Sequence, residues 1–265
     1  KTIKWLLLVA AVTAAQIAAA TSSTFGLKNT KKPNFIILFA DDLGSGDIGF
    51  YGHPTSSTPN LNTFIMEGAR LTQYYSAAAI CSPSRGSLMT GRLFPRLGIY
   101  PGVFSPLSVG GLPKKEKTIA AMLKEAGYAT GALGKWHLGT NEFLPTAHGF
   151  DYYFGAPMTQ NECYSNIHFP GSTSPSGTFG PCPLFNGSDE TVWQQSNGTY
   201  PSDPNAVDML EVDEAYDAAI ATFIRNATTA GTPFFFYYSS HHTHAPQFAG
   251  HAFLNQTERG LFGDS

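Results

Sequence analysis

The chain has 265 residues, of which 42% are hydrophobic and only 13% charged, with 27 Gly and 18 Pro. Soluble proteins average about 25% charged residues, so this composition excludes a disordered chain. The 16 Lys and Arg against 19 Asp and Glu leave a net charge of -3, which argues against a nucleic-acid-binding protein. The Gly and Pro content excludes a coiled coil, and the length suits one large domain or two small ones.

The first twenty residues are typical of a secretory signal peptide. A basic start precedes the apolar run 5–12, and small residues then lead to Ala20 and a polar stretch. This order predicts cleavage near Ala20; an N-terminal membrane anchor is the alternative, although the apolar run is short for a bilayer span. We therefore expect 1–20 to be a signal peptide, 21–33 a short N-terminal segment, and the mature protein to be exported.

Sequons and cysteines agree with export. N-glycosylation sequons begin at Asn186, Asn197, Asn226 and Asn255. Cys163 and Cys182 flank a Gly-, Ser- and Pro-rich stretch and could close it as a disulfide in an oxidising compartment. Cys81 is then the odd cysteine, and an unpaired thiol in an exported protein calls for a function.

Expected strands and helices alternate along the chain. The residue patterns predict a buried central strand at 34–40, a helix starting at 58–59, a helix at 118–126, a strand at 128–134, a helix at 207–228 and a strand at 233–238. Residues 155–205 read as a long irregular loop. Alternation of this kind predicts an α/β fold with a mostly parallel sheet, whose ligand site lies beyond the carboxyl ends of the strands.

Asp41 and Asp42 directly follow the first expected strand. Adjacent carboxylates repel each other unless a cation lies between them, and Gly44 and Gly46 would let the chain turn both toward one hard ion. An acidic turn or helix cap is the alternative.

Cys81 and Arg85 lie around an expected helix start. Pro83 places Cys81 at the helix N-terminus, where free N–H groups favour anions. Arg85, one turn later, can hold a negative group at the same place. A buried core thiol is the alternative for Cys81.

Lys135 and His137 would point to the same side of a strand, which suits oxyanion stabilisation and proton transfer. A surface lysine beside a hydrogen-bonded histidine is the alternative. His241, His242 and His244 follow the last expected strand. The strong zinc spacings with cysteine partners are absent, so we expect one histidine to act as an acid and the others to be structural.

These segments together resemble the sulfatase family, its arylsulfatases in particular. Cys-Ser-Pro-Ser-Arg at 81–85, followed by Thr-Gly-Arg at 90–92, matches the family signature Cys-x-Pro-Ser-Arg…Thr-Gly-Arg. The resemblance implies an α/β, alkaline-phosphatase-like fold with a mostly parallel central sheet flanked by helices. It covers 34–265 as the N-terminal part of the catalytic domain, with 160–205 as an irregular insertion and truncation before the C-terminal part.

The resemblance implies two cofactors. Cys81 would be oxidised to formylglycine by the formylglycine-generating enzyme in the endoplasmic reticulum. Asp41, Asp42 and residue 81 would bind Ca²⁺. The family's second metal pair, an Asp-Asn, and a second sulfate-binding lysine would follow Ser265, so the fragment alone is expected to be inactive.

The resemblance also implies how substrate is handled. Lys135 would bind the sulfate, and His244 would bind it and protonate the leaving oxygen. Arg85 would hold the formylglycine hydroxyls, and His137 would help break down the sulfated enzyme. Thr159 stands where the family has a sulfate-contacting serine.

The expected function is therefore sulfate ester hydrolysis, with a sulfated lipid, glycan or aryl sulfate as substrate. The enzymatic alternative is a phosphomonoester or phosphonate hydrolase of the same fold, and the other is a non-catalytic secreted sulfatase-like protein. We expect lysosomal or extracellular delivery, no nucleic-acid partner and no membrane span; a homo-oligomer is left open.

Overall fold

A computed structural model describes residues 31–100, 102–162, 184–187, 189–191, 209–260 and 264. Contacts divide the chain into Lys1–Pro33 and Asn34–Ser265, and the second unit holds every element described below. The expected signal peptide and the proposed Cys163–Cys182 disulfide lie outside the described residues.

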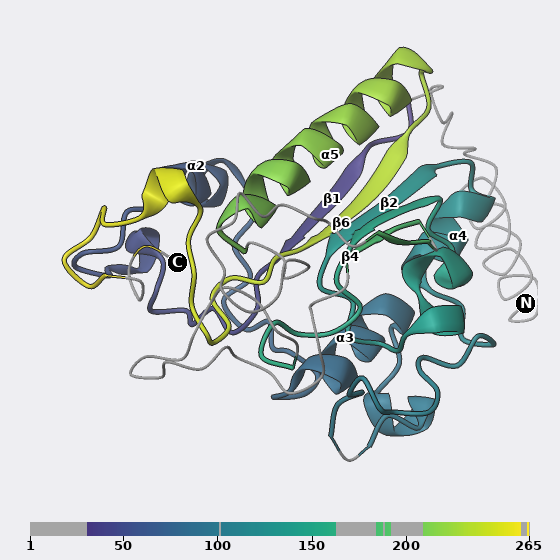
Figure 1. The fold of residues 1–265 in the computed structure, drawn as a ribbon. Helices are drawn as coiled ribbons and strands as arrows, with labels where there is room; N and C mark the ends of the chain where they lie inside the picture. Colours follow the sequence, from purple (N-terminus) through teal and green to yellow (C-terminus); the bar gives the residue numbers. More distant parts are fainter. Residues whose placement is uncertain are drawn as a thin grey trace, which may run out of the picture. The chain divides into compact units, whose positions relative to one another are not determined.

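A six-stranded sheet forms the centre of this unit (Figure 1). Its order is β1 (Phe35–Phe39), β6 (Phe234–Ser239), β2 (Ala129–Gly134), β3 (Tyr152–Gly155), β4 (Leu184–Asn186) and β5 (Asp189–Thr191). The first four strands are parallel, and β4 and β5 are antiparallel. The predicted α/β fold with a mostly parallel sheet is confirmed.

Helices pack against both faces of the sheet. The strand β6 contributes to both interfaces, because its alternate side chains point to opposite faces. Phe234 and Phe236 pack in one cluster with residues of α5 (Met209–Thr229). Phe235 and Tyr237 pack in the other cluster, with residues of α3 (Cys81–Thr90) and α4 (Ile119–Glu125). Each buried aromatic side chain contributes about 1.5–3 kcal/mol to folding, so β6 anchors both layers.

The predicted helices are confirmed close to their expected ends. The helix α2 (Pro59–Glu67) begins with proline at its first position. The Thr118 hydroxyl caps α4 by accepting a hydrogen bond from the Ala121 N–H at 3.1 Å. Local signals were sufficient here because capping depends on neighbouring residues.

The expectation that 34–40 is a buried central strand was wrong. The strand β1 forms, but it lies at the sheet edge with β6 as its partner among the described strands. Phe35 and Leu38 are 43% and 55% exposed. An apolar run identifies a strand, whereas the neighbours that bury it come from tertiary pairing.

The segment 160–205 is not wholly irregular, which corrects a second expectation. The strands β4 and β5 form a hairpin that pairs Asn186 with Asp189 and extends the sheet beyond β3. Gly187 has a φ of +74° at the turn, a conformation that glycine adopts readily. The Asn-Gly pair at 186–187 is a hairpin signal that the Pro- and Gly-rich surroundings obscured.

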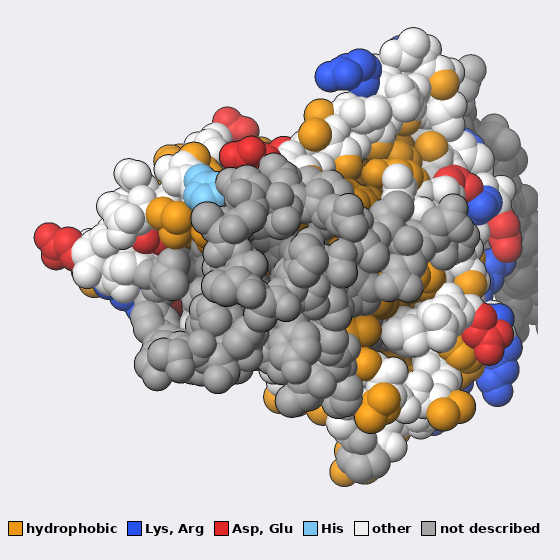
Figure 2. Space-filling view, in the orientation of Figure 1, with side chains coloured by type: hydrophobic (Ala, Val, Ile, Leu, Met, Phe, Trp, Pro, Cys, Tyr) orange, Lys and Arg blue, Asp and Glu red, His pale blue; other side chains and the backbone are white. Residues whose placement is uncertain are grey.

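One outer surface of this unit is apolar. A groove of about 520 Å³ beside α5 is lined by residues that include Tyr152, Ala219, Phe223 and Asn226. Figure 2 shows hydrophobic side chains exposed there.

Of the helices within the described ranges, none has both the length and the hydrophobicity that a bilayer span requires.

Candidate active site

The candidate residues converge at the carboxyl ends of the parallel strands. Asp41 follows β1, Lys135 follows β2, Thr159 lies beyond β3 and His244 lies beyond β6. Cys81 joins them from the first position of α3. Segments more than 200 residues apart thus meet at one edge of the sheet, where α/β folds bind ligands.

Asp41 is the charged centre of the cluster. Its carboxylate is buried, with Oδ2 2.5 Å from Lys135 Nζ and Oδ1 3.0 Å from Arg85 NH2. Burial raises the pKa of Asp41, but the charges of Lys135 and Arg85 outweigh this effect and hold the pKa below its usual value. Asp41 is therefore ionised at neutral pH.

The Cys81 thiol lies directly beside these charges. Lys135 Nζ donates to Cys81 Sγ at 3.2 Å, and Sγ lies 4.0 Å from Asp41 Oδ1. Burial raises the pKa of Cys81, while His137, His244 and Lys135 lower it to about 5. The sulfur is consequently a thiolate at neutral pH, the reactive form of cysteine.

Arg85 is buried beneath the cluster. Its NH1 group donates to the Lys135 carbonyl at 3.1 Å and to the Ser239 hydroxyl. Its Nε has no hydrogen-bond partner among the described residues, and its NH2 faces Asp41. Ser239 was not predicted as a site residue, and its only signal is its place as the last residue of β6.

Lys135 and His137 do not lie on a strand, contrary to expectation. Strand β2 ends at Gly134, which has a φ of +88°, and His137 itself has a φ of +57°. Both side chains are nevertheless buried at the site. His137 Nε2 lies 3.4 Å from Glu162 Oε2, a partner with no recognisable sequence signal.

The three clustered histidines have different partners. His241 Nε2 lies 3.2 Å from the Tyr216 hydroxyl, and His242 Nε2 lies 2.8 Å from Asp213 Oδ2. Only His244 faces Cys81, and the hydrogen bond between them raises the pKa of His244 above its ordinary value. Among the described residues, the group of side chains that could hold a metal ion contains His244 alone of the three histidines.

Asp41 lies in a group of side chains that could hold a metal ion, whereas Asp42 lies outside this group. Ligand atoms of Asp41, Cys81 and His244 lie within 4.8 Å of one another, and Asp42 Oδ2 is 3.8 Å from His244 Nε2. Carboxylates are the hard oxygen ligands that Ca²⁺ prefers, whereas a thiolate is soft. Residue 81 suits calcium only once oxygen replaces its sulfur.

The chain turns at Asp42 itself. Asp42 has a φ of +63°, which directs the backbone away from β1 immediately after Asp41. Aspartate is one of the few residues that adopts this conformation readily. Gly44 and Gly46, expected to provide the turn, do not have positive φ values.

Thr159 is tied to the histidine segment through its neighbour. Its buried hydroxyl donates to Gln160 Oε1 at 3.3 Å, and Gln160 Nε2 donates to the His244 carbonyl at 3.0 Å. Gln160 was not identified from the sequence, where it carries no distinguishing signal.

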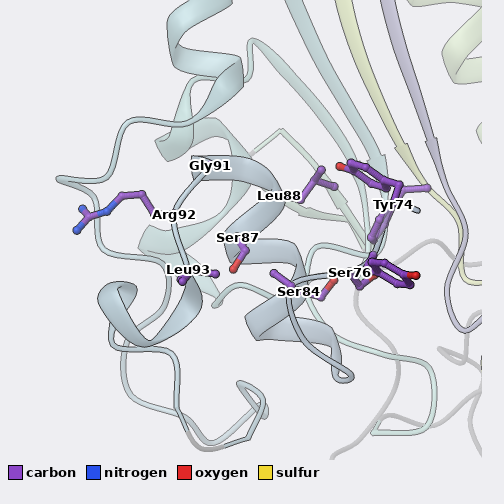
Figure 3. A pocket seen from close by; sticks show the side chains of 11 residues that line it. Tyr74, Ser76, Ser84, Ser87, Leu88, Gly91, Arg92 and Leu93 are labelled. Carbon is purple, nitrogen blue, oxygen red and sulfur yellow. The ribbon is translucent and has the colours of Figure 1, made fainter. Parts of the chain in front are cut away.

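Two adjoining cavities flank α3. A cleft of about 240 Å³ is lined by Asp41, Asp42, Cys81 and Arg85. The second cavity, about 230 Å³, runs along α3 and shares Ser84 with the first (Figure 3). Arg92 points away from this second cavity, and its NH1 pairs with Glu116 Oε2 at 2.6 Å. Another pocket, of about 360 Å³, reaches the site from the side of Asp42, Thr243 and Ala245.

The fold agrees with that of solved sulfatase structures. The Sulfatase family model matches residues 33–261, and the chain belongs to this family. Its fold is the alkaline-phosphatase-like sulfatase fold.

The curated relatives include arylsulfatases. The chain is 43% identical to arylsulfatase A of Bos taurus over 91% of its own length and 47% of the relative. It is 36% identical to N-acetylgalactosamine-6-sulfatase of Canis lupus familiaris, covering 88% of the chain and 44% of the relative. The chain thus spans about half the length of these relatives.

A solved structure agrees with this relationship. The PsFucS1 sulfatase of Pseudoalteromonas sp. superposes with a TM-score of 0.71 at 27% identity. The match covers 88% of this chain and 48% of that protein.

Proposed function

We propose that the full-length protein is an arylsulfatase-type sulfuric ester hydrolase that uses formylglycine made from Cys81 and a calcium ion. The observation that carries this proposal is the position of Cys81 at the start of α3, with Lys135 Nζ 3.2 Å from its sulfur and with Asp41 and His244 beside it. The signature that resembles the sulfatases supplies this cysteine, and family membership supports the reaction class.

The conversion of Cys81 replaces a soft thiolate with oxygen. As a hydrated aldehyde, residue 81 supplies a hydroxyl nucleophile for the sulfate ester and an oxygen ligand for calcium. Arg85 would hold these hydroxyls, which is supported by the unpartnered Nε at its buried guanidinium. Asp41 and Asp42 would hold the calcium ion.

The remaining residues would bind and protonate the substrate. Lys135 places a buried positive charge beside residue 81, where it would bind the negatively charged sulfate group of the substrate. His244 would donate a proton to the leaving oxygen, a role that its raised pKa suits. His137, with Glu162 beside it, would accept a proton when sulfate is released. Thr159 would contact the sulfate.

The substrate class is a sulfated lipid, glycan or aryl ester, and the relatives named for aryl and N-acetylgalactosamine 6-sulfates are compatible with this range. The signal-like N-terminus and the sequons favour the secretory pathway, with lysosomal or extracellular delivery.

Mass spectrometry and kinetics on the full-length protein, secreted from a eukaryotic host, test the proposal together. We expect formylglycine at residue 81, and hydrolysis of an aryl sulfate that exceeds hydrolysis of the matching aryl phosphate. The Cys81→Ala variant should lose the activity, and chelation should lower it. An unmodified thiol in every molecule would contradict the proposal. Preference for the phosphate would favour a phosphohydrolase, and binding of sulfated ligand without turnover would favour a non-catalytic protein.

A further inference from the structure

A row of buried polar side chains crosses the unit from α5 to the histidine segment. The Tyr216 hydroxyl lies 3.2 Å from His241 Nε2, and His241 Nδ1 lies 3.3 Å from Gln160 Oε1. Tyr216 and Gln160 are each 1% exposed, and His241 is 2% exposed. None of these three residues has a role in the proposed reaction.

The chemistry of the row gives each hydrogen bond a direction. Burial lowers the pKa of His241 to about 3, so its ring is neutral at pH 7 and carries one N–H. Because the Gln160 Oε1 atom can only accept, we assign that N–H to Nδ1, which leaves Nε2 to accept from Tyr216. The row therefore orients the Gln160 amide in one way.

The oriented amide holds the backbone of His244. Gln160 Nε2 donates to the His244 carbonyl at 3.0 Å and to the His241 carbonyl at 3.4 Å. The His244 ring has a close backbone contact only one residue away, with Nδ1 2.6 Å from the Ala245 carbonyl. The position of the ring thus depends on the backbone that Gln160 holds.

We propose that Gln160 is a positioning residue for His244, and that His241 and Tyr216 hold the Gln160 amide in the required orientation. The inference rests on the proposed function, in which His244 protonates the leaving oxygen. Proton transfer requires hydrogen-bond distance, and a shift of about 1 Å can cost roughly 100-fold in rate. Loss of the clamp should therefore slow the reactions that need the proton.

Leaving-group dependence distinguishes this role from a structural one. A nitrophenolate leaves without protonation, whereas the alkoxide of a sugar or alkyl sulfate does not. In the full-length protein, Gln160→Met keeps the side-chain length and removes the hydrogen bonds. We expect kcat for an alkyl sulfate to fall about tenfold or more beyond the fall for 4-nitrophenyl sulfate. Michaelis constants should change little for either ester.

Two tyrosine variants provide a matched comparison. Tyr216→Phe removes the hydroxyl that faces His241. Like Gln160→Met, it should lower the ratio of kcat for the alkyl sulfate to kcat for 4-nitrophenyl sulfate. Tyr238→Phe, whose ring contacts Tyr216, should leave the ratio unchanged. If Gln160→Met does not fold, Tyr216→Phe, which leaves Gln160 in place, carries the same expectation.

The outcomes separate the two proposals. Equal losses on both esters, or no loss, overturn the role of Gln160 while the proposed function stands. A wild-type protein that hydrolyses neither ester overturns both.

Discussion

Three buried charges and the partly buried thiol of Cys81 balance one another around Asp41. Lys135 and Arg85 are cations, and Asp41 and the low-pKa thiol of Cys81 are anions at neutral pH. Buried charges are costly unless they are paired and hydrogen-bonded, and here each has a partner within 4 Å. This balance explains how charged side chains can lie buried beside the reactive group at the cleft.

Removal of Arg85 should unbalance this cluster. We expect Arg85→Met to lower the free energy of unfolding by about 3 kcal/mol, because Asp41 loses one of its two buried partners. Urea unfolding followed by fluorescence measures the change. Lys117→Met is the control, since the Lys117–Glu125 pair is exposed on both sides and should contribute about 1 kcal/mol or less. Equal losses for the two variants would contradict the assignment.

A buried histidine outside the site should make stability depend on pH. Burial, with a smaller effect of the Lys114 charge, lowers the pKa of His148 to about 4. Between pH 6.5 and about 4 the unfolded state binds a proton that the native state does not, so stability falls as the pH falls. The slope is about 1.4 kcal/mol per pH unit for this group.

His148→Phe should reduce that slope, since the ring packs against Trp136 at 5.8 Å and phenylalanine cannot titrate. Unfolding free energies at pH 7 and pH 5 provide the comparison. The exposed His251 offers the control, and His251→Gln should leave the slope as in the wild type.

At the scale of elements, close backbone approach shapes the site. A Cβ at Gly134 would lie 2.0 Å from the Ser239 carbonyl oxygen, and a Cβ at Gly155 would lie 2.1 Å from the Gly134 oxygen. The ends of β2, β3 and β6 therefore meet without side chains between them. Lys135 N–H donates to the Ser239 carbonyl at 2.9 Å at this junction, which places the lysine beside Asp41.

Gly134→Ala should separate these strand ends. Its positive φ and the blocked Cβ position together predict a loss of about 3 kcal/mol or more in unfolding free energy, and loss of activity as Lys135 moves. Thermal unfolding and aryl sulfate turnover are the measurements. Gly46→Ala has open space around its Cβ and should behave as the wild type. A stable, active Gly134→Ala protein would refute this account of the junction.

At the scale of the whole molecule, the sequons test the expected route of export. Asn186, Asn226 and Asn255 are all exposed, whereas Asn197 lies outside the described residues. We expect the protein secreted by eukaryotic cells to lose mass when treated with a peptide N-glycosidase, because accessible sequons are modified in that pathway. Replacement of each of these asparagines by glutamine identifies the sites in use. An unchanged mass would contradict glycosylation along this route.

Local sequence was sufficient to predict most elements and the residues that meet at the site. Helix α4 follows from its Thr118 cap, and β6 from its aromatic run, because capping and periodicity involve residues close in the chain. Cys81 and Arg85 followed from one short signature. The position of β1 at the edge of the sheet could not be predicted in this way, because it depends on the order in which the strands pair. The contact of Gln160 with His244, 84 residues away, could not be predicted from the sequence either. Gln160 meets this partner only because β3 and β6 lie in one sheet.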